Sequence, residues 1–285
     1  MKPDPKFLGM NKRFWASVRS ASEFVGYSTR GRSSVLSPRF SEIENAFINI
    51  GIDKRVIADA ASEVGETVKQ VSLYFEYRAQ ILNDYVEPRL MDADRAKKVF
   101  EDLKNKLSPT CPLPMNKQTG DKKAPAYLTG IINMLIEANS GGMLCDYDPR
   151  GLTSFIKEGM PIRTLARRVD GAFPLITNPV ALWEIKEYYY TTTFGSRVAD
   201  GIYESLLDGM EIEELRDNEG IDVLHYLMVD SHFTWWDCGR SYLCRIIDML
   251  HMGYIDEALF GYEVVERLPG LVAMWVKLEK EKTGE

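Results

Sequence analysis

The spacing of apolar residues changes along the chain, and the change predicts two regions of different structure. In the first hundred positions apolar residues recur at helical spacing, and residues 53–86 and 92–107 each carry one apolar face. Ser41, followed three positions later by Glu44, has the form of a capping box and predicts a further helix. We therefore expect residues 1–104 to be α-helical.

The second half of the chain mixes short apolar runs with helical patterns. Prolines interrupt residues 105–125, which predicts a surface loop or linker. Residues 126–139 then carry a helical apolar stripe, whereas residues 180–186 and 223–229 are short apolar runs typical of buried strands. Because a helical pattern separates these two runs, we expect them to pair in parallel through a right-handed crossover. The sequence thus predicts an α/β fold for residues 126–285.

Charged residues interrupt one of the predicted strands. Glu184 and Lys186 are two positions apart and point to the same face of a strand, while Ile185 points into the core. Asp170 ends a preceding run, and Asn178 followed by proline is typical of a turn, so a hairpin would bring Asp170 beside Glu184 and Lys186. A Glu-x-Lys pair on a solvated strand is ordinarily two surface charges, but charges on a buried strand are costly unless they are paired or bind a ligand.

Two carboxylates and an ammonium in this arrangement can support phosphate chemistry. Carboxylate oxygens are hard ligands that suit Mg²⁺, which binds phosphate oxygens as well. A lysine beside the metal can stabilise charge that develops on a phosphate, or orient and activate a water molecule.

Asp170, followed after a short gap by Glu184-Ile185-Lys186 on a β-hairpin, resembles the signature of the PD-(D/E)XK nuclease superfamily, to which most type II restriction endonucleases belong. Val169 stands where that superfamily usually has proline. The resemblance implies a restriction-endonuclease-like central mixed β-sheet flanked by helices, here preceded by the α-helical N-terminal part. It also implies one or two Mg²⁺ ions bound by Asp170, Glu184 and the backbone carbonyl of Ile185, with Lys186 positioning or activating the attacking water.

The function implied by the resemblance is that of a Mg²⁺-dependent type II restriction endonuclease, a deoxyribonuclease that hydrolyses phosphodiester bonds of double-stranded DNA at a specific sequence. A palindromic target would imply a homodimer, because protein symmetry then mirrors site symmetry. Two alternatives remain open. One is a PD-(D/E)XK nuclease that acts in repair, defence or RNA cleavage, and the other is a non-catalytic DNA-binding protein of the same fold.

Members of the resembled superfamily often add a third acid from a helix that precedes the sheet. Glu63 and Glu66 in the predicted helix 53–86, and Glu137 near the end of residues 126–139, are candidates for this accessory acid. Ordinary exposed helix charge explains each of them as well. The acids at positions 211–219 are expected to form a solvated face far from the DNA.

Residues suited to contacting DNA occur in three stretches. Arginine can grip guanine edges with two hydrogen bonds, and hydroxyl groups at a helix N-terminus favour a bound phosphate. Flexible polar loops and plain helix capping would account for the same residues. The candidates are Arg30, Arg32, Arg167, Arg168, Thr192, Thr193, Ser196 and Arg197.

Composition and charge narrow the class of protein. The chain has 285 residues, 45% of them hydrophobic and 27% charged, which is typical of a globular protein. The net charge of −7 does not by itself indicate nucleic-acid binding, because such binding depends on a local positive surface and not on the average charge. No apolar run reaches the roughly 18 residues that span a bilayer, and the start lacks a signal-peptide pattern, so we expect an intracellular, cytoplasmic protein of a prokaryote with no membrane partner.

These observations predict three segments. Residues 1–104 would form a helical region for DNA recognition and dimerisation, residues 105–125 a linker or surface loop, and residues 126–285 the catalytic α/β nuclease core. The four cysteines contain no C-x-x-C pair, so neither a zinc site nor a disulfide framework is expected.

Overall fold

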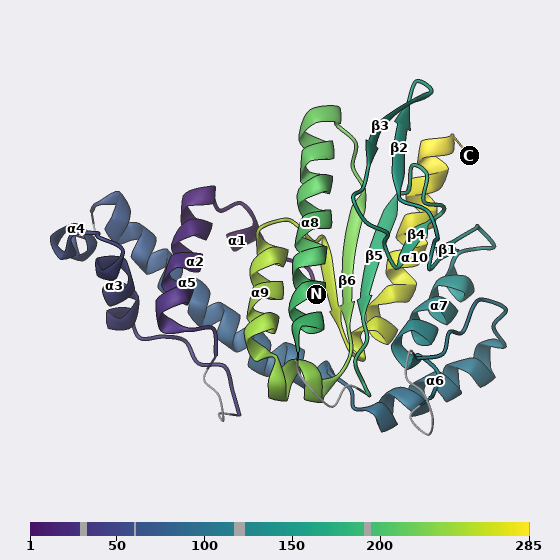
Figure 1. The fold of residues 1–285 in the computed structure, drawn as a ribbon, viewed down its shortest axis with the longest axis horizontal. Coiled ribbons are helices and arrows are strands. Elements are labelled where there is room, and N and C mark those ends of the chain that lie inside the picture. Colours follow the sequence, from purple (N-terminus) through teal and green to yellow (C-terminus); the bar gives the residue numbers. More distant parts are fainter. Residues whose placement is uncertain (29–32, 60, 117–122, 191–194, 285) are drawn as a thin grey trace.

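The computed structural model describes residues 1–28, 33–59, 61–116, 123–190 and 195–284 (Figure 1). Helices at the N-terminus lead into a twisted mixed sheet that carries helices on both faces. The predicted mixed α/β architecture, with an α-helical N-terminal part, is therefore confirmed. None of the helices within these ranges is both long and apolar enough to cross a membrane.

The N-terminal helices pack around one apolar cluster that includes Trp15, Val71 and Phe75. Helix α3 (Phe40–Asn49) has Arg39 as its N-cap, two residues before the predicted N-cap Ser41, because Glu42 accepts a 2.7 Å hydrogen bond from the backbone N–H of Arg39. The helices of this part are α1 (Pro5–Leu8), α2 (Lys12–Val25), α3 (Phe40–Asn49), α4 (Lys54–Ala58) and α5 (Glu63–Ile81), and α5 continues through the π-helical turn η1 (Leu82–Val86) and the 3₁₀ turn η2 (Glu87–Arg89).

The main sheet has five strands in the order β1-β4-β5-β6-β7. The pairs β1–β4 and β4–β5 are antiparallel, whereas β5–β6 and β6–β7 are parallel, as expected for strands that crossover helices connect. A separate antiparallel hairpin is formed by β2 and β3. The strands are β1 (Asp146–Tyr147), β2 (Ser154–Lys157), β3 (Met160–Thr164), β4 (Gly171–Phe173), β5 (Ala181–Lys186), β6 (Leu224–Val229) and β7 (Glu257–Phe260).

Two helical layers cover the main sheet. Helices α6 and α7 with α10 share one apolar cluster with the sheet, and α8 with α9 lies on the opposite face (Figure 1). The helices of this region are α6 (Ala93–Leu107), α7 (Tyr127–Asn139), α8 (Ser196–Glu219), the π-helical turn η4 (Phe233–Cys238), α9 (Arg240–His251) and α10 (Glu263–Thr283).

Successive side chains of β5 point to opposite faces of the sheet, so each contacts one of the two helical layers. Trp183 stacks on Trp275 of α10, with ring centroids 5.5 Å apart and planes 8° from parallel. Leu182 lies in the opposite cluster, with Ile212 and Leu215 of α8. Because side chains two apart share a face, Glu184, which follows Leu182 by two, must lie under α8.

Two contacts between helices bear on the predicted division of the chain. Helix α6 begins within the predicted helical region 1–104, yet its Phe100 packs so closely on Gly130 of α7 that a Cβ at Gly130 would lie 2.4 Å from the ring. Helix α6 therefore shares the core of the sheet region. Helix α5 is joined to α9 by a buried pair in which Arg78 donates two 3.0 Å hydrogen bonds to Asp248.

Candidate active site

The β4–β5 hairpin brings Asp170 next to Glu184. Gly171 pairs with Trp183, so the residue before Gly171 lies beside the residue after Trp183. Trp183 explains why a glycine follows Asp170, because a Cβ at Gly171 would lie 2.1 Å from the indole ring. Asp170 Oδ2 accepts a 2.8 Å hydrogen bond from the backbone N–H of Ile185. In an antiparallel strand pair, the N–H and C=O of one residue point toward the same neighbouring strand, so the Ile185 carbonyl should lie on the side of β5 where Asp170 lies.

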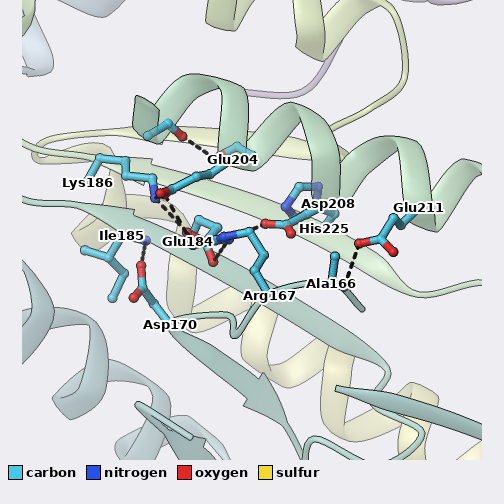
Figure 2. A network of polar contacts seen from close by, with 12 residues as sticks. Ala166, Arg167, Asp170, Glu184, Ile185, Lys186, Glu204, Asp208, Glu211 and His225 are labelled. Atoms are coloured by element: carbon cyan, nitrogen blue, oxygen red, sulfur yellow. Dashed lines mark hydrogen bonds and ion pairs between the residues drawn. The ribbon is translucent and has the colours of Figure 1, made fainter. Parts of the chain in front are cut away.

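Glu184 and Lys186 lie on one face of β5, as their spacing predicts. Lys186 Nζ donates a 2.7 Å hydrogen bond to Glu184 Oε2, and the two side chains are only 7% and 0% exposed. The structure thus brings together the three side chains that the sequence singled out, Asp170, Glu184 and Lys186 (Figure 2).

Helix α8 adds two acids to this group that sequence reasoning missed. Glu204 Oε2 accepts hydrogen bonds from Lys186 Nζ at 3.1 Å and from Arg167 Nη2 at 3.3 Å. One turn further on, Asp208 Oδ2 accepts a 2.6 Å hydrogen bond from Arg167 Nη1. Arg167 also lies against Glu184, with Nη1 2.9 Å from Oε1 (Figure 2).

The spacing along α8 carried a signal for this contact. Gly201, Glu204, Asp208 and Glu211 follow one another at three and four positions and therefore share one helix face. Glu211 accepts a 3.0 Å hydrogen bond from the backbone of Ala166, so part of the acidic stretch expected to be solvated lines this site instead. The reason is that α8 continues to Glu219 and lies along the sheet.

Burial and neighbouring charges perturb the acids of the site. Burial, and then the charge of Glu184, raises the pKa of Asp170 to about 6. Burial, and then the same charge, raises the pKa of Asp208 to about 7. For Glu184 burial acts in the same direction, but the charges of Lys186 and Arg167 outweigh it and lower the pKa below its usual value. Glu184 is therefore ionised at neutral pH.

Lys186 is a charged ammonium in this environment. Burial disfavours its charge, but the carboxylates of Glu184 and Asp170 outweigh burial and raise the pKa of Lys186 above its usual value. A lysine with a raised pKa keeps its protons at neutral pH. Lys186 can therefore donate hydrogen bonds and stabilise negative charge, but it is not suited to removing a proton from water.

The three upstream acids do not join Asp170 and Glu184. Glu63 pairs with Arg13 at 2.7 Å on the N-terminal helices, and Glu66 accepts a 2.9 Å hydrogen bond from Gln70. Glu137 accepts a 3.0 Å hydrogen bond from the backbone of Thr110. Glu137 belongs to α7, which covers the opposite face of the sheet from α8. The acid beside the pair comes from α8, downstream of the hairpin.

The residues predicted to contact DNA fall into three groups. Arg167 is directed into the carboxylates of the site, whereas its neighbour Arg168 is exposed and makes no ion pair or hydrogen bond with any residue in the described ranges. Ser196 and Arg197 begin α8, but their side chains lie outside the described part of the chain. Arg30, Arg32, Thr192 and Thr193 also lie outside the described residues.

The donor set at the hairpin fits a hard divalent cation. Glu184 Oε1 is buried and accepts no hydrogen bond from a described residue, although Arg167 Nη1 lies 2.9 Å from it, so a metal cation at this oxygen would compete with that ion pair. Asp170 and the Ile185 carbonyl add two further oxygens, and Mg²⁺ commonly uses one or two carboxylates with water completing its shell. Among the described residues no cluster of three or more His, Cys, Asp or Glu side chains is placed to hold a metal, so this site depends on the backbone carbonyl.

Comparisons with known proteins divide the chain close to the end of the N-terminal helices. No curated protein and no solved structure matches the chain. Residues 1–85 match a family model described as a domain of unknown function, DUF7690. Residues 91–275 match a second model, also described as a domain of unknown function, DUF7687, and this match covers more than half of the sequence. The chain therefore belongs to the DUF7687 family.

Proposed function

We propose that the chain is a Mg²⁺-dependent nuclease with a restriction-endonuclease-like core, acting as a type II restriction endonuclease on double-stranded DNA. One observation carries the proposal: Glu184 and Lys186 hydrogen-bond on one face of β5, and Asp170, across the β-hairpin, accepts a hydrogen bond from the backbone of Ile185 between them. The hairpin continues into a parallel pair, β5–β6, through a crossover helix, which is consistent with a mixed sheet of that class.

Asp170, Glu184 and the Ile185 carbonyl would hold the metal ion. When bound, Mg²⁺ would polarise a phosphoryl oxygen and acidify a bound water. Lys186, fixed by Glu184 at 2.7 Å and Glu204 at 3.1 Å, would donate hydrogen bonds to the phosphate or the attacking water as negative charge develops. Hydrolysis adds water across the bond between phosphorus and the 3′ oxygen, and leaves a 5′ phosphate and a 3′ hydroxyl.

Charges around the site limit how DNA approaches it. Glu211 and Glu214 of α8 share one cation, Arg163, so this group of three keeps an excess negative charge that would repel a phosphate backbone. Arg168, two positions before Asp170, is exposed and makes no ion pair with a described residue, so it would be free to contact a phosphate. A palindromic target would require two copies of the chain, each supplying one site.

A second candidate is a nucleic-acid-binding protein of the same fold that does not cut. The full burial of Glu184, together with its pairing to two cations, favours this candidate, because buried ion networks also serve structure alone. A nuclease that acts in repair, in defence or on RNA would share the site and differ in substrate.

Cleavage assays separate these candidates. We expect the wild-type protein to cut plasmid DNA into discrete fragments with Mg²⁺ and to be inactive with EDTA. Asp170→Asn and Lys186→Met should each lower the cleavage rate by about 100-fold or more, since each removes charge that acts on the transition state. Lys277→Met is the matched control, because Lys277 is 75% exposed on α10 and pairs only with Glu281 among described residues.

The outcomes point to different conclusions. Both site variants should still shift a DNA duplex in a gel with Ca²⁺ in place of Mg²⁺. A smear of fragments would indicate a non-specific nuclease, and binding without any cleavage would support the second candidate. Cleavage by Asp170→Asn at the wild-type rate, or cleavage that persists in EDTA, would refute the proposed function.

A further inference from the structure

Arg167 lies among three carboxylates from two different elements. It precedes β4 and reaches across β5 to α8, where Nη1 donates to Asp208 Oδ2 at 2.6 Å. The same Nη1 lies 2.9 Å from Glu184 Oε1, and Nη2 lies 3.3 Å from Glu204 Oε2. A guanidinium has five N–H donors in a fixed plane, so it can hold several acceptors at once.

Both oxygens of Glu184 are in contact with cations of the chain itself. Lys186 binds Oε2 at 2.7 Å, Arg167 Nη2 donates to the same oxygen at 3.2 Å, and Arg167 Nη1 faces Oε1. A divalent cation that binds Glu184 must therefore share or displace one of these contacts. Lys186 is the shorter contact and belongs to the same strand, so Arg167 is the group that can yield.

Asp208 can accept the hydrogen bonds of the Arg167 guanidinium when Arg167 moves away from Glu184. Its carboxylate is fully buried, and its hydrogen bond to Arg167 is the shortest that this guanidinium makes. Its second oxygen, Oδ1, accepts no hydrogen bond from a described residue. A guanidinium that turns toward α8 would gain this acceptor while it gives up Glu184.

The net charge of this group of residues is consistent with a divalent cation replacing Arg167 at Glu184. Four carboxylates and two cations lie within it, so when all are ionised it carries two excess negative charges, which one divalent cation neutralises. In a poorly solvated site, charges at contact distances interact strongly, so this excess negative charge favours the binding of a divalent cation. The members are Asp170, Glu184, Glu204, Asp208, Arg167 and Lys186.

We propose that Arg167 is an internal counter-ion that competes with the divalent cation for Glu184, and that Asp208 is the acceptor that receives Arg167 when the cation binds. The inference rests on the proposed function, because it takes Glu184 as a metal ligand. It makes Arg167 and Asp208 positioning residues that set the metal affinity of the site, in opposite directions.

Direct titration with Mn²⁺, without DNA, tests this pair. We expect Arg167→Gln to bind Mn²⁺ about tenfold more tightly than the wild type and Asp208→Asn about tenfold more weakly, measured by calorimetry or by the electron paramagnetic resonance signal of free Mn²⁺. A change in local charge alone would also tighten Mn²⁺ binding in Arg167→Gln and weaken it in Asp208→Asn. The double variant separates the two explanations, because in the exchange Asp208 acts only through Arg167.

In the Arg167→Gln background, Asp208→Asn should therefore change Mn²⁺ affinity by less than about twofold, and the double variant should bind more tightly than the wild type. If charge alone acted, the double variant would match the wild type, since its net charge is the same. That result, or weaker binding by Arg167→Gln, would overturn the inference. Should Arg167→Gln fail to fold, the comparison of the double variant with the wild type still decides.

The same titration keeps the two proposals apart. If neither the wild type nor any variant binds Mn²⁺, or if Glu184→Gln binds it as well as the wild type does, the proposed metal site is wrong. If the wild type binds Mn²⁺ through Glu184 but the double variant does not exceed it, only the exchange of Arg167 is refuted.

Discussion

Gly201 offers a way to move Lys186 without touching any charged group. The glycine lies on α8 where the helix passes over β5. A Cβ at this position would lie 3.1 Å from Lys186 Cδ and 3.2 Å from both Lys186 Cε and the Tyr188 hydroxyl. The Lys186 ammonium is fixed by Glu184 at 2.7 Å and Glu204 at 3.1 Å, so the lysine stem cannot yield without lengthening these bonds. Gly201→Ala should therefore displace the ammonium by a few tenths of an ångström.

The effects of Gly201→Ala on stability and on activity should differ. Alanine in place of glycine inside a helix stabilises by about 1 kcal/mol. The tight contact, relieved by an off-rotamer lysine, costs about 0.5–1.5 kcal/mol. The free energy of unfolding should therefore stay within about 1 kcal/mol of the wild type. The cleavage rate should fall about tenfold or more, because small displacements of a group that positions reactants are costly.

Urea unfolding and DNA cleavage at saturating Mg²⁺ measure the two effects. Gly270→Ala is the matched control, because beyond the neighbouring backbone of α10 itself no described residue has an atom within 4 Å of a Cβ at that position. The control should gain about 1 kcal/mol in stability and cut at the wild-type rate. A Gly201→Ala protein that cuts as fast as the wild type would refute the role given to the position of Lys186. A loss of more than about 3 kcal/mol would show that the strain does not fall on the lysine stem.

Two further predictions concern pH and the N-terminal helices. Because a metal ligand must be ionised and the pKa of Asp170 is raised to about 6, Mn²⁺ affinity should fall roughly tenfold per pH unit below that value, and change less above it as Asp208, whose pKa is raised to about 7, loses its proton. A flat profile from pH 5 to 8 would exclude Asp170 as a ligand. Arg78→Met should lower the free energy of unfolding by about 3–5 kcal/mol, because it leaves Asp248 buried without its cation. The exposed ion pair of Arg13 with Glu63 provides the control, and Arg13→Met should lower the free energy of unfolding in urea by less than about 1 kcal/mol. Equal losses of stability in Arg78→Met and Arg13→Met would contradict the reasoning.

The strands of the candidate site could be predicted from local pattern because a strand repeats every two residues. Glu184 and Lys186 had to share a face, and the turn at Asn178 had to return the chain toward Asp170. Both expectations hold in the structure. The same alternation places Trp183 on the other face, where it packs over Gly171 and against α10.

The contribution of α8 could not be predicted in the same way. Which face of the sheet a crossover helix covers depends on the handedness and order of strands far apart in sequence. From the sequence alone, Glu204 and Asp208 are therefore indistinguishable from exposed charged residues of a helix. Their role becomes visible only once α8 is placed over β5. The small residue Gly201, at the same face as both acids, was the local signal that this side of α8 approaches another element closely.

The upstream acid that the resemblance implies does not reach the site for a related reason. Glu137 lies on a helix that precedes the hairpin, as the resemblance required, but α7 covers the face of the sheet opposite to α8. Sequence order does not determine which face a helix covers. Likewise, the loop before α7 reads as a division of the chain, yet Phe100 of α6 packs against Gly130 across it.

Diffraction from crystals of the protein soaked in Mn²⁺ tests the proposed metal site most directly. We expect an anomalous peak about 2.0–2.5 Å from oxygens of Asp170 and Glu184 and from the Ile185 carbonyl, with the Arg167 guanidinium turned toward Asp208. Strong anomalous density elsewhere in the molecule, with Glu184 still bound only to Arg167 and Lys186, would contradict a metal-dependent nuclease site at this hairpin.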